Sequence, residues 1–173
     1  MNKAIFFDRD GVLNELVARD GGYFSPRAYS QFVIIEENKK VLEKSKKNGF
    51  VNIVVSNQPD ISRGLLLEDE LRKMSEKLKN ELLIDDIFYC THDDVDNCYC
   101  RKPLPGLVIN AAEKWNINLG KSLLVGDTKK DVEAAIAINL KYFLLNKHYN
   151  RDDPYSNRIE NLDDIFFEIG VEG

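Results

Sequence analysis

Residues 3–11 have the sequence KAIFFDRDG, and this stretch decides the fold expected for the rest of the chain. Lys3–Phe7 is short and apolar, which predicts a buried strand. The strand ends at Asp8, and Asp10 follows on the same face of the extended chain. Two carboxylates so placed can bind a divalent cation, and one can act as a nucleophile while the other transfers protons. Gly11 then allows the backbone to turn sharply.

The same alternation of apolar runs and amphipathic segments continues to the end of the chain. It predicts further strands at 50–55, 86–89, 122–125 and 141–145, and helices at 38–48, 67–83, 105–115, 129–138 and near 162–169. The glycine-containing stretch 11–26 is expected to form a long loop or flap. Strands that alternate with helices indicate an α/β fold, a three-layer Rossmann-like parallel sheet, here as one domain over 1–173. The site of such a fold lies outside the carboxyl ends of the strands.

Composition excludes several classes of protein. The 173 residues are 43% hydrophobic and 31% charged, which is typical of one globular domain. With 24 basic and 29 acidic side chains, the net charge of −5 argues against nucleic acid or an anionic membrane as partner. No apolar run approaches the roughly 18 residues that span a bilayer. The apolar segment near the N-terminus is too short for a signal peptide, and the acidic Asp8 follows it directly. We therefore expect a cytoplasmic monomer.

Three more polar clusters follow strands or precede helices. Ser56 and nearby backbone amides can hold a phosphate oxygen, and Arg101 with Lys102 forms a cationic pair beside a helix N-terminus. Asp127 stands at a strand tip, where it would complete a Mg²⁺ site of oxygen ligands, and Asp131 lies one helical turn further on. Each cluster alone also fits a capped turn or a solvated charge. Together they converge on one crevice, which favours a shared site.

The three cysteines of the chain are clustered with a histidine. Cys90, His92, Cys98 and Cys100 supply three thiolates and one imidazole, a set typical of structural Zn²⁺. The set uses every cysteine and one of the two histidines. The alternative is a group of reduced, buried cysteines with a surface histidine. Four protein ligands leave no open position on the metal, so we expect a structural zinc. It would hold Arg101 and Lys102, which follow Cys100, at the mouth of the site.

The order of these motifs resembles the haloacid-dehalogenase superfamily of phosphohydrolases over residues 3–146. The resemblance rests on Asp8-x-Asp10, Ser56, Lys102 and Gly126-Asp127-x-x-x-Asp131. It implies that Asp8 is the nucleophile and forms an aspartyl-phosphate. It also implies that Asp10 is the general acid and base and contacts Mg²⁺ through its backbone carbonyl. Ser56 would bind the phosphoryl group, Lys102 would balance charge, and Asp127 would ligate Mg²⁺ together with Asp8. Asp131 would orient these groups without ligating the metal.

The cysteine loop is similar to the zinc-containing branch of this superfamily, which holds heptose bisphosphate and histidinol phosphate phosphatases without a large cap domain. The segments 8–14, 56–64 and 100–106 look more like the heptose enzymes, whereas the short gap between His92 and Cys98 looks more like the histidinol phosphate enzymes. The implied activity is Mg²⁺-dependent hydrolysis of a phosphate monoester, with a heptose 1,7-bisphosphate as the favoured substrate. Histidinol phosphate or another small sugar phosphate is the alternative.

Substrate contacts are expected from residues around these motifs. We expect Arg63 and Arg101 to hold the sugar or its remaining phosphate, and Asn57 to donate a hydrogen bond to the substrate. Thr128 stands where the heptose enzymes often carry a lysine. Lys129 or Lys130 would then replace that contact.

Three other classes of protein share part of this pattern. A receiver-like phosphoacceptor domain also uses acidic residues and Mg²⁺, but its acceptor ends an internal strand, whereas Asp8 ends the first strand. A zinc-stabilised interaction module on an inactive scaffold would not need the intact charge set. A DNA 3′-phosphatase is disfavoured by the acidic composition.

Overall fold

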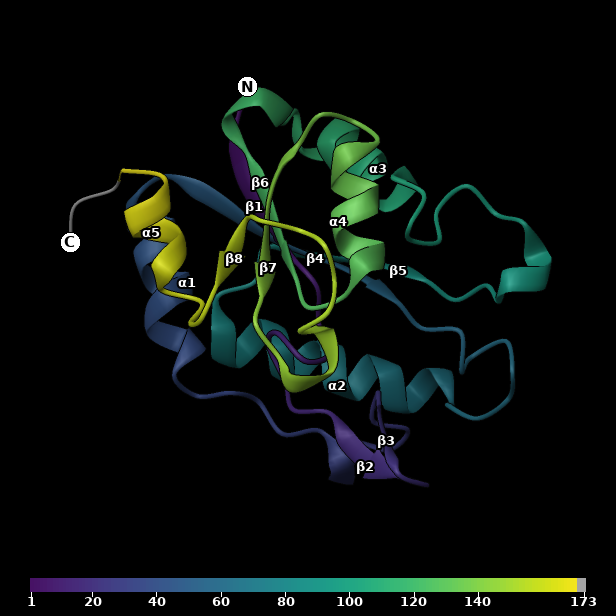
Figure 1. Cartoon of the computed structure of the whole chain (residues 1–173). Helices are drawn as coiled ribbons and strands as arrows, with labels where there is room; N and C mark the ends of the chain where they lie inside the picture. The colour runs from purple at the N-terminus through teal and green to yellow at the C-terminus, as the bar shows by residue number, and fades with distance from the viewer. Residues whose placement is uncertain (171–173) are drawn as a thin grey trace.

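One parallel sheet forms the centre of the computed structural model, which describes residues 1–170 (Figure 1). Its strands are β1 (Lys3–Phe7), β4 (Phe50–Asn57), β5 (Asp86–Cys90), β6 (Leu123–Gly126), β7 (Lys141–Leu145) and β8 (Arg158–Ile159). Their order across the sheet is β5-β4-β1-β6-β7-β8, and every neighbouring pair is parallel. The predicted α/β fold, a parallel sheet with helices on both faces, is confirmed. The last three residues of the predicted domain lie outside the described residues.

Helices cover both faces of the sheet because the buried strands alternate their side chains. The helices are α1 (Asn38–Lys47), α2 (Glu68–Leu82), α3 (Gly106–Trp115), α4 (Lys129–Ile136) and α5 (Asp164–Glu168). Ile5 and Phe7 of β1 pack into the cluster that contains side chains of α1, α2 and α5. Ala4 and Phe6 pack into the opposite cluster, with side chains of α3 and α4. A period of two in β1 therefore builds two cores, one on each face.

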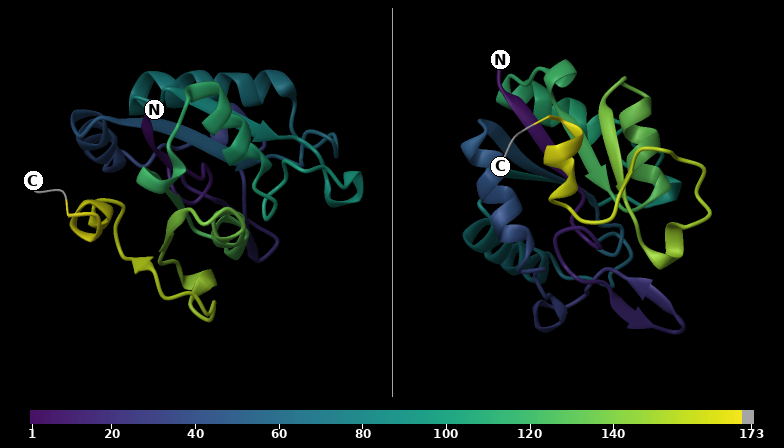
Figure 2. Two further views of the ribbon diagram at one scale, coloured as in Figure 1. Left: turned by 90° about the horizontal axis from the view of Figure 1, so that it is seen from above. Right: turned by 60° about the vertical axis from the view of Figure 1, so that its left-hand side comes forward.

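The flap predicted for 11–26 contains a small hairpin, β2 (Val17–Arg19) and β3 (Gly22–Phe24). It is a separate two-stranded sheet and projects from the main body of the fold (Figure 2). The residues that the structure describes form no separate cap domain. Within the same residues, no helix is both long and apolar enough to cross a bilayer.

Two features of the sheet differ from the sequence prediction by more than one residue. The strand predicted at 50–55 continues through Ser56 and Asn57, whose partners on β5 are Tyr89 and Cys90. A sixth strand, β8, pairs with the end of β7 although only two residues form it. Such a short strand carries too little periodicity to stand out in the sequence. Its place at the sheet edge depends on the packing of Ile159 and α5 into the core.

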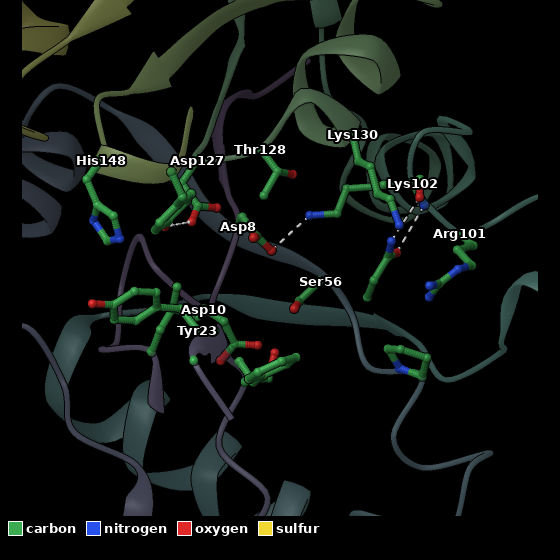
Figure 3. Close-up of a pocket in the computed structure, with 18 residues that line it drawn as sticks. Asp8, Asp10, Tyr23, Ser56, Arg101, Lys102, Asp127, Thr128, Lys130 and His148 are labelled. Carbon is green, nitrogen blue, oxygen red and sulfur yellow. Dashed lines mark hydrogen bonds and ion pairs between the residues drawn. The ribbon is translucent and has the colours of Figure 1, made fainter. Parts of the chain in front are cut away.

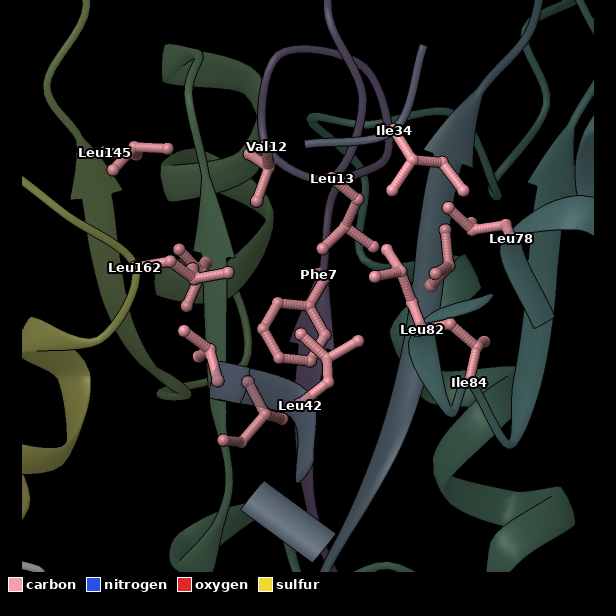
Figure 4. Packing of buried hydrophobic residues seen from close by; sticks show 14 of the residues in the cluster. Phe7, Val12, Leu13, Ile34, Leu42, Leu78, Leu82, Ile84, Leu145 and Leu162 are labelled. Carbon is pink, nitrogen blue, oxygen red and sulfur yellow. The ribbon is translucent and has the colours of Figure 1, made fainter. Parts of the chain in front are cut away.

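The core between α2 and the sheet is tested by Leu78→Ala. Leu78 is fully buried in the cluster of Figure 4, so its truncation leaves a cavity. We expect a loss of about 2–5 kcal/mol in the free energy of unfolding, measured by chemical denaturation. Leu67→Ala is the matched control, because Leu67 is 69% exposed just before the same helix. It should change stability by less than about 0.5 kcal/mol. Equal losses in both variants would contradict this packing.

Candidate active site

The carboxyl ends of β4, β1 and β6 meet at the floor of a cavity of about 720 Å³. The amide of Asp8 donates to the carbonyl of Val125, which continues the pairing of β1 with β6 beyond the last strand residue. Asp8, Ser56 and Asp127 therefore line one cavity, although they lie far apart in the sequence (Figure 3). This is the convergence that the strand-end motifs predicted.

Lys102 connects a carboxylate at the tip of β1 with a carboxylate in helix α4. Its Nζ donates to Asp8 Oδ1 at 2.8 Å, to the carbonyl of Val55 at 2.8 Å and to Asp131 Oδ1. The side chain is almost fully buried, which by itself would lower the pKa of the ammonium group. The carboxylates of Asp131 and Asp8 outweigh this effect and raise the pKa of Lys102. The ammonium ion is thus charged and uses all three of its donors.

Asp8 is buried at the tip of β1 and faces Lys102. Burial raises the pKa of Asp8 to about 6, and the nearby carboxylates of Asp131 and Asp10 add to this rise while Lys102 opposes it. Asp8 lines the cavity, lies beside a cation and is shielded from bulk water, which suits a nucleophile.

Asp127 supplies the second carboxylate of the cavity floor and is 2% exposed. Its Oδ1 is buried and accepts no hydrogen bond from the described residues. Burial and the Asp8 carboxylate raise the pKa of Asp127 well above its usual range. Carboxylate oxygens of Asp8, Asp127 and Asp131 lie within 4.8 Å of one another. Hard divalent cations prefer oxygen ligands. These carboxylates, and the unpartnered Oδ1 of Asp127 in particular, therefore fit such a cation.

Asp131 acts on the site from the start of α4. Its Oδ2 accepts hydrogen bonds from the amide of Thr128 at 3.1 Å and from Thr128 Oγ1 at 2.7 Å, while Oδ1 binds Lys102. Gly126 makes this close approach possible, since a Cβ there would overlap the Asp131 side chain. Both oxygens of Asp131 are therefore engaged, which agrees with a residue that orients others.

Asp10 is held in a different environment. Its carboxylate accepts hydrogen bonds from Arg9 Nε and Nη2 at 3.0 Å, from Asn14 Nδ2 at 3.0 Å and from Gln58 Nε2 at 2.7 Å. Burial alone would raise the pKa of Asp10, but Arg9 and these donors hold it below its usual range. The carboxylate is therefore held in one orientation, and these contacts favour its charged form.

Arg9 is a residue of the site that the sequence reasoning missed. Its side chain is fully buried, and its guanidinium lies 5.5 Å from the ring centre of Phe32 and 5.6 Å from that of Tyr89. Two aromatic rings and the Asp10 carboxylate together compensate the buried charge. A charged residue between two carboxylates was the available signal, but only the tertiary structure places the rings around it.

Two predicted phosphate or substrate contacts lie at the end of β4. Ser56 lines the cavity, and its Oγ accepts a hydrogen bond from Gln58 Nε2 at 3.0 Å. Asn57 also lines the cavity, but its amide is already engaged: Nδ2 donates to the carbonyl of Lys102, and Oδ1 accepts from the amide of Lys102. Asn57 thus positions the Lys102 segment. A direct contact of Asn57 with substrate stays a prediction.

The two predicted substrate arginines occupy different places. Arg101 lines the cavity, and its Nε donates to Asp94 Oδ1 at 2.6 Å. Arg63 is not among the cavity residues and pairs instead with Asp93 and Asp60. Acidic residues of the 90–100 loop therefore hold both arginines. Arg63 joins the loop after β4 to the 90–100 loop, and a contact of Arg63 with substrate stays a prediction.

The four predicted zinc ligands come together in the structure. The Sγ atom of Cys100 lies 3.3 Å from that of Cys90, 3.5 Å from that of Cys98 and 3.4 Å from His92 Nδ1. No disulfide joins them. Zinc–sulfur bonds of about 2.3 Å give tetrahedral edges of roughly 3.7 Å. The donor atoms lie slightly closer together than these edges, and their clustering is compatible with a closed, four-coordinate zinc site.

The side of the cavity opposite the cations is aromatic. Tyr23 and Phe24 of the β2–β3 hairpin and His148 and Tyr149 after β7 form what we term the aromatic wall. In Figure 3, Tyr23 and His148 lie on the side of Asp127, whereas Arg101, Lys102 and Lys130 lie across the cavity. The sequence reasoning missed this wall, because the aromatic residues come from two irregular segments without a common motif. Of the two candidate lysines, Lys130 lines the cavity and Lys129 does not.

Comparison with known proteins agrees with this geometry. Residues 27–139 match the family model described as haloacid dehalogenase-like hydrolase. A solved D,D-heptose 1,7-bisphosphate phosphatase from B. bronchiseptica, complexed with magnesium and phosphate, has a TM-score of 0.85, with 99% of each chain covered and 24% sequence identity. This similarity concerns the fold. The chain belongs to the haloacid dehalogenase-like hydrolases, and it is a phosphatase.

Curated relatives share more of the sequence. A D-glycero-beta-D-manno-heptose-1,7-bisphosphate 7-phosphatase from Helicobacter pylori (strain J99) is 32% identical over 161 residues, which cover 90% of this chain and 89% of the relative. A D-glycero-alpha-D-manno-heptose-1,7-bisphosphate 7-phosphatase from Burkholderia mallei is 35% identical over 146 residues, with 77% of this chain and 74% of the relative covered. The relatives thus include proteins named for either anomer.

Asp8→Asn tests the nucleophile. The amide keeps the shape of the side chain but cannot attack phosphorus, so kcat for phosphate release should fall by about 10³-fold or more. The thermal midpoint should stay within about 4 °C of the wild type, equivalent to roughly 1 kcal/mol. Phosphate release and thermal unfolding are measured on the same preparation. Retained turnover would remove Asp8 from this role.

Proposed function

We propose that this phosphatase removes the 7-phosphate of a D-glycero-D-manno-heptose 1,7-bisphosphate. The observation that carries the proposal is the arrangement of Asp8, Lys102 and the unpartnered Oδ1 of Asp127 at the floor of a cavity. It is supported by relatives of that name, which are 32–35% identical over most of the chain.

In the proposed reaction, an oxygen of Asp8 attacks phosphorus as the bond to the sugar oxygen breaks. Asp10 gives the leaving oxygen a proton, and the phosphoryl group is then covalently held by Asp8. Water next attacks the phosphorus of this aspartyl-phosphate, Asp10 accepts the proton, and phosphate leaves with Asp8 regenerated. The charged form of Asp10, which Arg9 and its other donors stabilise, suits the second half of the cycle.

Several groups of the chain are placed to stabilise charge on the phosphoryl oxygens. Ser56 lines the cavity near Asp8, and Lys102 compensates the charge of the nucleophile. Oxygens of Asp8 and Asp127 and the backbone carbonyl of Asp10 are the proposed ligands of Mg²⁺. When bound, the cation neutralises charge on the transferring group.

The second phosphate of a bisphosphate requires cations beyond the reacting centre. Arg101 and Lys130 line the cavity on the side of Lys102, opposite the aromatic wall. Arg101 is oriented by Asp94, so its guanidinium is preorganised. We propose that these two side chains bind the phosphate that stays on the sugar. The aromatic wall would contact the apolar C–H face of the sugar ring.

We also propose that Cys90, His92, Cys98 and Cys100 hold a structural Zn²⁺. The clustering of their donor atoms supports a closed site, and Asp93 and Asp94 in the same loop bind Arg63 and Arg101. The metal would thereby fix the loop that orients Arg101. A cytoplasmic location and a monomeric state, with neither nucleic acid nor membrane as partner, stay predictions from composition.

A substrate comparison tests the proposed activity. Phosphate release from both anomers of heptose 1,7-bisphosphate, from histidinol phosphate and from hexose bisphosphates is measured side by side. We expect the highest kcat/KM for a heptose bisphosphate, with one phosphate released per molecule. A clear preference for histidinol phosphate would replace the proposed substrate. A stable phosphoprotein without phosphate release would instead support a receiver-like function.

Lys130→Ala tests the site of the second phosphate. Loss of a charged hydrogen bond should raise KM for the bisphosphate about tenfold and change KM for the heptose 7-monophosphate, which lacks the second phosphate, much less. Lys129→Ala is the matched control, because Lys129 is the preceding residue on α4 and does not line the cavity. Equal effects of the two substitutions would contradict a specific contact of Lys130.

The zinc proposal is tested with the two histidines of the chain. His92→Ala should remove most of the zinc found by elemental analysis and lower the thermal midpoint, because the metal stabilises the folded loop. His148→Ala should retain the zinc, since His148 lies on the aromatic wall. Absence of zinc from protein purified without chelator would contradict the structural zinc site.

A further inference from the structure

The segment after β7 contacts the proposed magnesium ligand directly. Tyr149 lies in the short helix η4 (His148–Asn150), and its hydroxyl donates a hydrogen bond to Asp127 Oδ2. The neighbouring Asn150 is buried, and its Nδ2 donates to the backbone carbonyls of Asp127 and Leu145 at 2.8 Å. Two consecutive residues of η4 therefore hold the side chain and the backbone of Asp127.

The two oxygens of Asp127 have different surroundings. Oδ2 is enclosed between the Tyr149 hydroxyl and Gly11, where a Cβ would overlap Oδ2 and lie 2.9 Å from the hydroxyl. Gly11 adopts φ = +86°, a conformation that also favours glycine. Oδ1 is buried without a partner. The hydroxyl thus occupies one oxygen and leaves the other to ligate a cation.

Aromatic contacts fix the ring that carries this hydroxyl. The ring centre of Tyr149 lies 5.0 Å from that of His148 and 6.3 Å from that of Tyr23, and Tyr23 lies 4.7 Å from His148. Tyr23 belongs to the β2–β3 hairpin, so both segments of the aromatic wall contribute. Rings packed in this way have few alternative positions, and the hydroxyl is therefore directed at Asp127.

We propose that Tyr149 is a positioning residue that holds Asp127 Oδ2 and thereby sets the geometry of Oδ1 as a magnesium ligand. The inference rests on the proposed function, because it assumes that Asp127 ligates Mg²⁺. A hydrogen bond to the non-ligating oxygen fixes the rotation of the carboxylate, as partners behind metal ligands commonly do. Tyr149 itself touches neither the cation nor the reacting atoms in this role.

The choice of cation gives a signature that a purely structural tyrosine would lack. Mg²⁺ requires nearly ideal octahedral geometry, whereas Ca²⁺ accepts irregular arrangements of oxygen ligands. A carboxylate that is free to rotate should therefore weaken the binding of Mg²⁺ more than that of Ca²⁺. General loosening of the fold would weaken both cations alike and lower the thermal midpoint of the metal-free protein.

Tyr149→Phe is the test, because it removes the hydroxyl and keeps the ring. Calorimetric titration of the full chain with MgCl₂ and, separately, with CaCl₂ gives both dissociation constants, and thermal unfolding is followed without metal. We expect the Kd for Mg²⁺ to rise about tenfold or more and the Kd for Ca²⁺ to rise less than about threefold. The thermal midpoint of the metal-free protein should stay close to that of the wild type.

Tyr155→Phe is the matched control. The Tyr155 hydroxyl donates to Glu133 Oε1 at 3.1 Å on the exposed side of α4, so the same atom is removed from a tyrosine–carboxylate pair outside the cavity. Both dissociation constants should match the wild type. If Tyr149→Phe binds Mg²⁺ as tightly as the wild type, or loses Mg²⁺ and Ca²⁺ affinity equally, the positioning role of Tyr149 is overturned.

Wild type and Asp127→Asn are titrated in the same series to separate the two proposals. Mg²⁺ binding by the wild type that is lost in Asp127→Asn supports the metal site, whatever the result for Tyr149→Phe. If the wild type does not bind Mg²⁺, or Asp127→Asn binds it as well as the wild type, the proposed magnesium site itself is wrong and the inference falls with it.

Discussion

Lys102 places one buried positive charge between a carboxylate at the tip of β1 and a carboxylate at the start of α4. Without it, Asp8 and Asp131 would be like charges in a dry environment, a costly arrangement. Its third hydrogen bond, to the carbonyl of Val55, connects β4 to the same point. The Lys102 ammonium group therefore links β1, β4 and α4, which are separated in the chain, at the floor of the cavity.

The two acidic residues of the first motif have opposite environments. Burial raises the pKa of Asp8 to about 6, whereas Arg9 and its neighbouring donors keep the pKa of Asp10 low. The proposed roles follow from position: Asp8 faces Lys102 at the cavity floor and is the proposed nucleophile, whereas Asp10, fixed by Arg9, is the proposed proton carrier.

Much of the candidate site followed from local pattern. The bounds of β7 agree with the sequence prediction, as do the positions of Asp8 and Asp127 at strand tips, because apolar runs that end in acidic residues are a strong local signal. The cysteine and histidine cluster was predictable from residue type and spacing. The role of Asn57 was not, since only the folded chain shows its amide bound to the Lys102 backbone.

The sequence by itself determined the alternation of strands and helices, the acidic strand ends and the donor set of the 90–100 loop. These properties are local, because they depend on neighbouring residues and on a period of two or 3.6. Only the tertiary structure decided which charges are paired and which face the cavity. Arg63 pairs with Asp93 of the 90–100 loop, and Lys130 lines the cavity. Tyr149, from a segment with no motif, donates a hydrogen bond to Asp127. Such contacts depend on distances between segments far apart in the chain, and no local periodicity encodes those distances.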